Sequence, residues 1–285
     1  MALKLAVVGN CQALGVAQCL SLLLPRAEVT GVSWATIISP QHAEPVAKAL
    51  ESCDLVLSQV THQDRYGALR ADALSGRLER LFYFPRIAFT GFHPDLIGMA
   101  AVKSPLGGAH SALILAGHGL GLPAERIAEL FNAYVYARLG YFEEYAKAEA
   151  YLIESVRQTE LELTEDMADW GRQGAFVHTP THPAIRVLRS MARALCVRTG
   201  LDIEGAGEPP DALLESVIWP VYPEIAKRLG VAGSLAFNPP GAEAAPIDLH
   251  RMIDGSLRVY ARSDPQSICP PRIAEMMDIL KRECV

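Results

Sequence analysis

The residue in this sequence best suited to nucleophilic chemistry is a cysteine near the start. Cys11 stands in the sequence Gly9-Asn10-Cys11-Gln12, directly after an apolar run that ends at Val8. A thiolate is a capable acyl acceptor, and the N–H groups and positive dipole end of a helix N-terminus lower the pKa of a thiol. We therefore expect an acyl-accepting thiol with a lowered pKa at Cys11. The alternative is a small buried residue that only packs.

Carboxamide side chains flank this cysteine and end a second apolar run. Asn10 and Gln12 lie on either side of it, and Gln59 closes the run CDLVLSQV. Together with backbone N–H groups, amide side chains can stabilise the oxyanion of an acyl-transfer intermediate. Gln59 is expected either to hydrogen-bond a substrate or simply to end its strand. Gly9 is assigned to cofactor binding, although the residues around it do not form a GxGxxG dinucleotide fingerprint.

A histidine motif follows the fourth predicted strand. His93 lies in the sequence Gly91-Phe92-His93-Pro94-Asp95. An imidazole titrates near neutral pH, so His93 is a candidate general base or acid. Asp95 has two interpretations, either orienting a histidine or capping a helix that starts close to Leu96.

A second histidine pair lies later in the chain. His178 and His182 are four residues apart, a spacing that suggests a metal site when both residues lie in one helix. Pro180 opposes a regular helix between them, and no third ligand is evident, so we expect no metal. We instead expect Pro183 at the first position of a helix, with His182 near its N-cap as a neutral base or ligand donor, or as a packed surface residue.

Two further residues have both a structural and a functional interpretation. Ser111 opens a predicted helix, where it would serve as N-cap or contact substrate. Arg186 shares one helix face with Arg189 and Arg193. This face would bind the phosphates of a cofactor, or it would be a solvated helix face.

The elements that would position these residues alternate between strand and helix. Strand patterns cover residues 3–8, 28–34, 53–60 and 81–90, and helical patterns cover 12–24, 43–52 and 64–79. This alternation predicts an α/β fold with a parallel sheet of about four or five strands. Ligands of such sheets bind at the carboxyl ends of the strands, where Cys11, Gln59 and His93 all follow strands.

The second part of the chain has a different texture. Long helical patterns dominate after residue 105, and the tail is rich in glycine and proline. We therefore expect an α/β part over residues 1–104 and a large, mainly helical part over 105–285 that packs on it as one continuous body.

Composition limits the classes of function. The chain has 285 residues, of which 50% are hydrophobic, and its formal net charge is -6. This balance argues against a nucleic-acid partner but leaves room for a local basic pocket that binds a phosphate. Six cysteines without a CxxC pair indicate free thiols in a reducing compartment, so we expect a cytoplasmic protein. No apolar run approaches the roughly 18 residues of a membrane span.

Taken together, several motifs resemble the WcbI-type polysaccharide biosynthesis family. These motifs are VVGNCQ, CDLVLSQV, PRIAFTGFHPD, HSALILA and THPAIRVL, in this order, followed by the closing stretch PVYPEIAKRLGVAGSLAFNPP. The resemblance spans about residues 4–260. The pairing of GNCQ with GFHPD is its most specific feature.

The resemblance implies a role in bacterial capsule synthesis, with acetyl-coenzyme A as co-substrate for the O-acetylation of a sugar. It also implies an α/β part similar in outline to the SGNH hydrolases, which carry a nucleophile just after the first strand. In that comparison Cys11 takes the place of the serine. His93 and His182 lie within matching motifs, and either of them is the candidate partner of the thiol.

Three functional hypotheses follow from these residues. The first is an acyltransferase that takes a small-molecule thioester and a carbohydrate acceptor, with peripheral association to the capsule machinery. Its acyl group either passes through Cys11 or is attacked directly by a sugar hydroxyl that a histidine deprotonates. The second is a thioesterase that uses water, and the third is a non-catalytic subunit that binds coenzyme A or sugar.

Overall fold

The computed structural model of the protein describes residues 2–241 and 244–284, and its chain divides into two compact units. Unit 1 combines the segment up to Ala88 with Tyr151–Phe176 and His182–Leu213, and unit 2 combines Phe89–Ala150 with Val177–Thr181 and the segment from Leu214 onward. The predicted boundary at residue 104 differs from this division. The chain returns to the first unit after residue 150 because a long later helix packs against the first helix.

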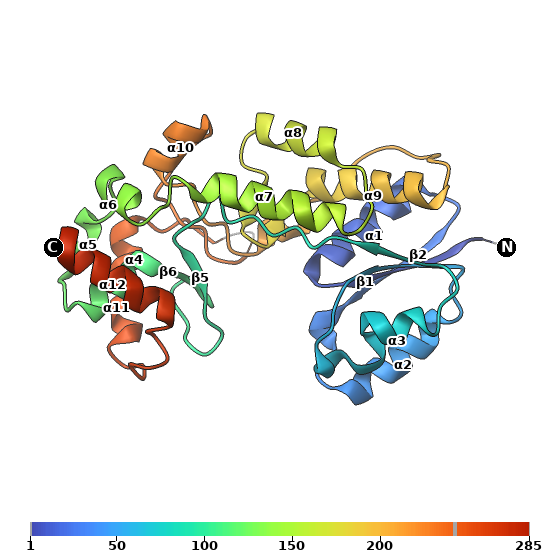
Figure 1. Ribbon diagram of the computed structural model, residues 1–285, viewed down its shortest axis with the longest axis horizontal. Coiled ribbons are helices and arrows are strands. Elements are labelled where there is room, and N and C mark those ends of the chain that lie inside the picture. Colours follow the sequence, from blue (N-terminus) through green and yellow to red (C-terminus); the bar gives the residue numbers. More distant parts are fainter. Residues whose placement is uncertain (1, 242–243, 285) are drawn as a thin grey trace. The chain divides into compact units, whose positions relative to one another are not determined.

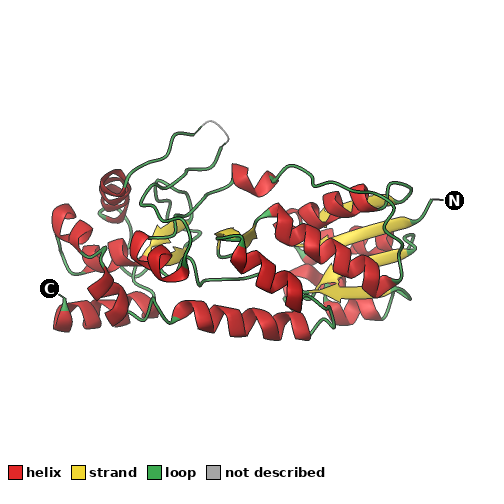
Figure 2. Ribbon diagram, turned by 90° about the horizontal axis from the view of Figure 1, so that it is seen from above, coloured by secondary structure: helices red, strands yellow, loops and turns green. Residues whose placement is uncertain are grey.

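Unit 1 is built on a parallel sheet of four strands, as the sequence predicted. The strands are β1 (Lys4–Gly9), β2 (Glu28–Ser33), β3 (Leu55–Gln59) and β4 (Leu81–Phe84), in the order β2-β1-β3-β4. Figure 2 draws the strands in yellow. The two central strands are almost fully buried, which explains their continuous apolar sequence. The fourth strand is shorter than expected because Pro85 has no N–H to continue the ladder.

Helices cover both faces of this sheet (Figure 1). α1 (Cys11–Leu23) and α9 (Ile185–Thr199) pack against each other on one face, and α2 (Pro40–Leu50) lies on the other. Contact between α1 and α9 is close at Gly15, where a Cβ atom would lie 2.4 Å from Leu188 Cδ1. Glycine at this position therefore lets the first and the last long helix of unit 1 meet.

The helix expected over residues 64–79 is broken in the structure. It consists of the 3₁₀ segment η2 (Asp64–Leu69) and the short α3 (Ala71–Ser75). Gly67 has a φ of 44°, in the left-handed region, which a right-handed helix does not accommodate. The remaining elements of unit 1 are η1 (Trp34–Thr36), α8 (Thr164–Arg172) and β8 (His182–Pro183).

Unit 2 is mainly helical, with one small antiparallel hairpin that the sequence analysis missed. The hairpin pairs β5 (Leu96–Gly98) with β6 (Ala109–Ser111), and β6 leads directly into α4 (Ala112–Gly119). Three-residue strands carry too little periodicity to be recognised from sequence. The other elements of this unit are β7 (Val177–Thr179), α5 (Ala124–Glu129), α6 (Ala133–Arg138), α10 (Pro223–Leu229), α11 (Leu249–Tyr260) and α12 (Pro271–Glu283).

Two elements have residues in both units, namely α7 (Glu144–Arg157) and η3 (Ala212–Glu215). Within the described residues, no helix combines the length and the apolar character needed to cross a bilayer.

Candidate active site

The turn between β1 and α1 places Cys11 at the carboxyl edge of the sheet. Asn10 is the N-cap of α1, and its Oδ1 accepts the backbone N–H of Gln12 at 2.9 Å. The backbone C=O of Asn10 accepts the N–H of Ala13 at 3.0 Å. Cys11 is therefore the first residue of the helix, one residue before the helical pattern predicted over 12–24, and it is partly exposed.

Gln59, at the end of β3, hydrogen-bonds the turn between β1 and α1. Its Oε1 accepts the backbone N–H of Asn10 at 2.9 Å, and its Nε2 donates to Oε1 of Gln12 at 3.2 Å. Gly9 makes room for this contact, because a Cβ atom at that position would lie 2.6 Å from the Gln59 Oε1. The glycine thus serves the packing of a glutamine side chain in this structure.

Gln12 completes a closed network of neutral hydrogen bonds. Its Nε2 donates to the C=O of Ile87 at 2.7 Å, and its Oε1 accepts the N–H of Ile87 at 3.0 Å. Gln12 was a candidate for stabilising an oxyanion, and Gln59 was expected either to contact substrate or to end its strand. Both side chains are buried and hydrogen-bond the turn, and their roles toward substrate stay predictions. Ile87 was missed because the sequence gives no sign that a backbone amide after β4 pairs with a side chain.

The pKa of the Cys11 thiol is raised, so the expectation of a net lowering is wrong. Burial is the largest cause, and it outweighs the backbone N–H groups of Cys11 and Gln12 and the charge of Arg86, which all act to lower the pKa. Arg86 is exposed and lies just past the end of β4, yet the sequence analysis did not select it. Its position just past the end of a strand is the sequence feature that could have identified Arg86 as a candidate.

His182 lies in unit 1, but it does not cap a helix. It belongs to β8, and α9 begins only at Ile185, so the expected helix start at Pro183 is wrong. The N-terminal N–H of Ile185 is capped instead by the carboxylate of Asp211, at 2.9 Å, a contact between distant residues that the local sequence did not indicate. β8 contacts α1, the helix that Cys11 begins.

Arg186 hydrogen-bonds the backbone of unit 1. Its guanidinium donates to the C=O of Trp170 at 3.2 Å and of Ala175 at 3.1 Å. These contacts secure the end of α8 and its following turn. The proposed role of Arg186 in cofactor binding stays a prediction.

His93 is buried in unit 2, and its Nδ1 has no hydrogen-bond partner among the described residues. Burial lowers the pKa of His93 to about 3, while a hydrogen bond with the Trp219 backbone acts in the opposite direction and the charge of His178 lowers it further. The imidazole is therefore neutral at physiological pH. An unpaired buried ring nitrogen is unusual in a native protein and marks His93 as a functional candidate.

Asp95 does not cap a helix at Leu96, because that residue begins β5. Its Oδ1 instead accepts the N–H of Leu113, at 2.9 Å, and the hydroxyl of Tyr141, at 2.8 Å. Its Oδ2 accepts the hydroxyl of Tyr222 at 2.6 Å. Both carboxylate oxygens thus bind groups of unit 2, and one of these bonds is made in the first turn of α4.

Ser111 is the N-cap of α4, which confirms its structural interpretation. Its Oγ accepts the N–H of Ile114 at 3.2 Å, and the residue is fully buried. A role in substrate binding stays a prediction. The expectation that Cys11 lies beside a histidine side chain also stays a prediction.

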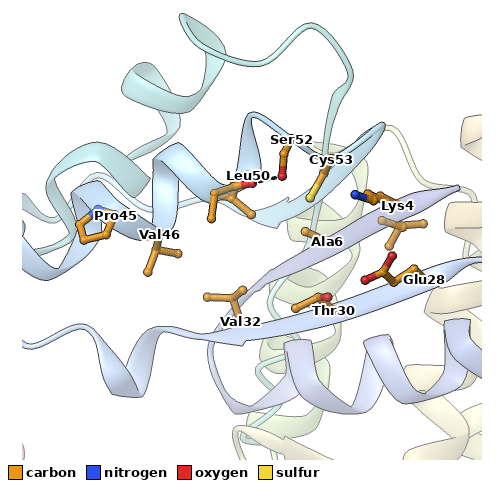
Figure 3. A pocket seen from close by; sticks show the side chains of 12 residues that line it. Lys4, Ala6, Glu28, Thr30, Val32, Pro45, Val46, Leu50, Ser52 and Cys53 are labelled. Atoms are coloured by element: carbon orange, nitrogen blue, oxygen red, sulfur yellow. Dashed lines mark hydrogen bonds between the residues drawn. The ribbon is translucent and has the colours of Figure 1, made fainter.

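A hollow of about 460 Å³ in unit 1 is lined by the side chains drawn in Figure 3, none of which belongs to the GNCQ turn. It opens between α2 and the face of β1 and β2, and its lining includes Lys4, Glu28 and Cys53, all near the amino ends of strands. Ligand sites of parallel sheets lie at the opposite, carboxyl ends. Among the described residues, no group of three or more His, Cys, Asp or Glu side chains is placed to hold a metal ion.

These features define a parallel α/β protein with a cysteine at the first strand–helix turn. Residues 4–204 match the model of the family described as polysaccharide biosynthesis enzyme WcbI, so the chain belongs to this family. A solved structure described as WcbI, a novel polysaccharide biosynthesis enzyme, has the same fold with a TM-score of 0.75 at 14% identity, over 99% of this chain and 96% of that one. That structure is described as the native protein without a disulfide bond between coenzyme A and one of its cysteines. A search of curated proteins gave no significant match.

Proposed function

We propose that this chain is a coenzyme A-dependent O-acetyltransferase of capsule polysaccharide synthesis, which transfers an acetyl group to a carbohydrate hydroxyl. The observation that carries the proposal is the partly exposed Cys11 thiol, held by a closed network at the carboxyl edge of the sheet. A merely structural turn does not require a thiol there, whereas acyl transfer requires a positioned nucleophile.

Coenzyme A is the proposed acyl carrier. The solved structure of the same fold is described by the absence of a disulfide between coenzyme A and a cysteine of that protein. Such a disulfide requires the coenzyme A thiol to reach that cysteine, and an acetyl group is carried on the same sulfur. In this chain Cys11 is the thiol at the ligand edge of the sheet.

The proposed reaction has two balanced steps. In the first, the Cys11 sulfur attacks the thioester carbonyl carbon, the bond to the coenzyme A sulfur breaks, and the proton lost by Cys11 passes through an imidazole to the departing thiolate. In the second, a sugar hydroxyl oxygen attacks the acetyl carbon, its proton goes to the imidazole, and the Cys11 thiolate is released. Arg86 supplies positive charge to the Cys11 thiolate and to the developing oxyanion.

His182 is the imidazole that we assign to Cys11. It lies in the same unit, in a strand that contacts α1. The neighbouring start of α9 packs at Gly15, one turn beyond Cys11, where the Ile185 side chain approaches. Both contacts support the assignment of His182 as the imidazole partner of Cys11.

His93 serves the alternative route, in which the sugar hydroxyl attacks acetyl-coenzyme A directly. Its Nδ1 has no hydrogen-bond partner among the described residues but is buried, so it could accept a proton from a hydroxyl only if the site opened. A base with a pKa of about 3 is weak at neutral pH, however, so this route requires a change in the surroundings of His93. The acyl-cysteine route is therefore the one that we propose.

Rapid-quench mass spectrometry tests the proposal. After mixing with acetyl-coenzyme A, the full-length protein is expected to gain one acetyl group on Cys11. Cys11→Ala should abolish this species and the transfer to a sugar acceptor, whereas Cys269→Ala, which changes an exposed cysteine in unit 2, should leave both unchanged.

Other outcomes identify the other hypotheses. Release of acetate without sugar transfer would identify a thioesterase. Full acetyl transfer by Cys11→Ala together with its loss in His93→Gln would identify the direct route. Binding of coenzyme A without turnover, unchanged in Cys11→Ala, would identify a non-catalytic subunit and refute an enzymatic role.

A further inference from the structure

Unit 2 contains a hollow of about 580 Å³ with strongly basic walls. One wall is the turn of the β5–β6 hairpin, and the other is the last part of α11 and the residues that follow it. Its lining includes Lys103, Ser104 and Pro105 from the hairpin, and Gly255, Arg258 and Arg262 from the helical side. We call this hollow the basic pocket.

The hairpin wall is held rigidly by its own hydrogen bonds. The backbone groups of Ser104 and Gly107 bond each other in both directions, at 2.7 and 3.0 Å. The Ser104 hydroxyl donates to the C=O of Ala109 at 2.6 Å and accepts the N–H of Leu106 at 2.9 Å. Lys103 therefore extends from a fixed turn.

The two walls also fit closely together. A Cβ atom at Gly255 would lie 2.4 Å from Cγ of Pro105, so glycine allows the hairpin to approach α11. This contact fixes the backbone of the hairpin turn relative to α11. The backbone that carries the walls of the basic pocket is therefore packed and hydrogen-bonded.

The three cations of the pocket are not neutralised by carboxylates. Lys103, Arg258 and Arg262 are exposed, and none of them forms an ion pair with an acidic group of the described residues. The chain as a whole has a formal charge of -6, so this concentration of positive charge runs against its composition. The carboxyl end of α11 contributes about half a negative charge, which three full positive charges outweigh.

We propose that the basic pocket binds the pyrophosphate group of a substrate. A pyrophosphate ester presents adjacent negative oxygens to bidentate guanidinium donors and to an ammonium group. Two substrates that carry this group are an activated sugar linked to a nucleoside diphosphate and coenzyme A. The proposal concerns binding only, and it does not depend on acyl transfer at Cys11.

Calorimetric titration of the full-length protein at low ionic strength tests this site. The probes are uridine diphosphate, coenzyme A and inorganic pyrophosphate. The combined variant Lys103→Ala, Arg258→Ala, Arg262→Ala should bind pyrophosphate at least about tenfold more weakly than the original protein does. It should show a similar loss of affinity for uridine diphosphate or for coenzyme A. Salt should weaken binding to the original protein more than binding to the variant.

Arg251→Ala is the matched control, since Arg251 is exposed on the same helix but does not line the pocket. The single variants Arg258→Gln and Lys103→Gln repeat the test with smaller changes in structure. Equal affinities in the combined variant and the original protein would overturn the proposal, as would an equal loss in Arg251→Ala.

The probes separate the two sources of pyrophosphate. Selective loss of uridine diphosphate binding assigns the pocket to an activated sugar, and selective loss of coenzyme A binding assigns it to the acyl donor. Acetylation of Cys11 is measured separately. A protein that binds pyrophosphate in this pocket but never acetylates Cys11 would refute the acyl-cysteine route and leave the pocket assignment standing.

Discussion

The two units hold their central polar residues by opposite means. In unit 1 the Gln12 and Gln59 carboxamides form a neutral network that leaves the neighbouring Cys11 thiol partly exposed. In unit 2 the Asp95 carboxylate is fully buried and binds two tyrosine hydroxyls and one backbone N–H. The first network positions a reactive group beside it, whereas the second connects distant segments of its unit.

This difference predicts different costs of disruption. Removing the Gln12 amide leaves two backbone groups unpaired at about 1–3 kcal/mol each at most, whereas removing one buried carboxylate that three donors share leaves three groups unpaired and costs about 3–5 kcal/mol in total. The comparison also predicts which substitutions change the reactivity of the thiol and which change only the stability of the fold. Changes in unit 1 should affect the thiol as well as the fold, and changes at Asp95 should act through the fold.

The largest expected effect is that of Asp95→Ala. It leaves the hydroxyls of Tyr141 and Tyr222 and the N–H of Leu113 without their acceptor, so the free energy of unfolding should fall by about 3–5 kcal/mol. Urea denaturation measures this change. Asp254→Ala, at an exposed position of the same unit, is the control, and similar losses in the two variants would contradict the structural role of Asp95.

Gln12→Ala should destabilise the protein by about 2–3 kcal/mol, because it leaves both backbone groups of Ile87 unpaired. Alkylation of Cys11 by iodoacetamide should also change in rate, since the turn loses its support. Gln18→Ala, at an exposed position of α1, should change neither quantity. A stable variant with an unchanged thiol would show that the network does not position Cys11.

His93 should make the protein less stable in mild acid. Its pKa is about 3 in the folded state and near 6.5 in the unfolded state, so the unfolded state binds the proton between these values. Stability is therefore present above pH 6.5 and is lost as the pH falls, by about 2 kcal/mol at pH 5.

Denaturation curves at several pH values measure this slope, and His93→Gln should flatten it. His250→Gln, at an exposed histidine, is the control. An unchanged slope in His93→Gln would assign the acid sensitivity to other groups.

The smallest expected effect is at Arg86. Its charge lowers the pKa of Cys11, so Arg86→Gln should raise that pKa and slow alkylation at neutral pH by about two- to fivefold. Arg80→Gln, at an exposed arginine just before the other end of β4, should have no such effect. Faster alkylation of Cys11 in Arg86→Gln would contradict the inference that Arg86 lowers the pKa of this thiol.

Local sequence patterns predicted much of unit 1. The apolar runs of β1 and β3 are buried on both sides, so their identity as parallel strands was visible without tertiary information. The helical pattern predicted over residues 12–24 agrees to within one residue at each end with α1. The β5–β6 hairpin was missed because its strands are only three residues long.

The candidate site depends on contacts that local patterns do not contain. Ile87, which pairs with Gln12, and Asp211, which caps α9, each meet a partner far away in the sequence. The sign of the Cys11 pKa shift was wrong for a similar reason. Helix position favours the thiolate, but burial by the surrounding fold disfavours it more strongly.

The fit between Gly9 and Gln59 has a consequence for variation among related sequences. Because the Gln59 side chain occupies the volume that a Cβ atom at position 9 would need, Gly9 is not free to gain a side chain while Gln59 is present. A relative that carries alanine or serine at the first position should have a shorter residue at the second. The two sites are therefore expected to covary, and a library that randomises both together should recover active pairs that single substitutions never reach.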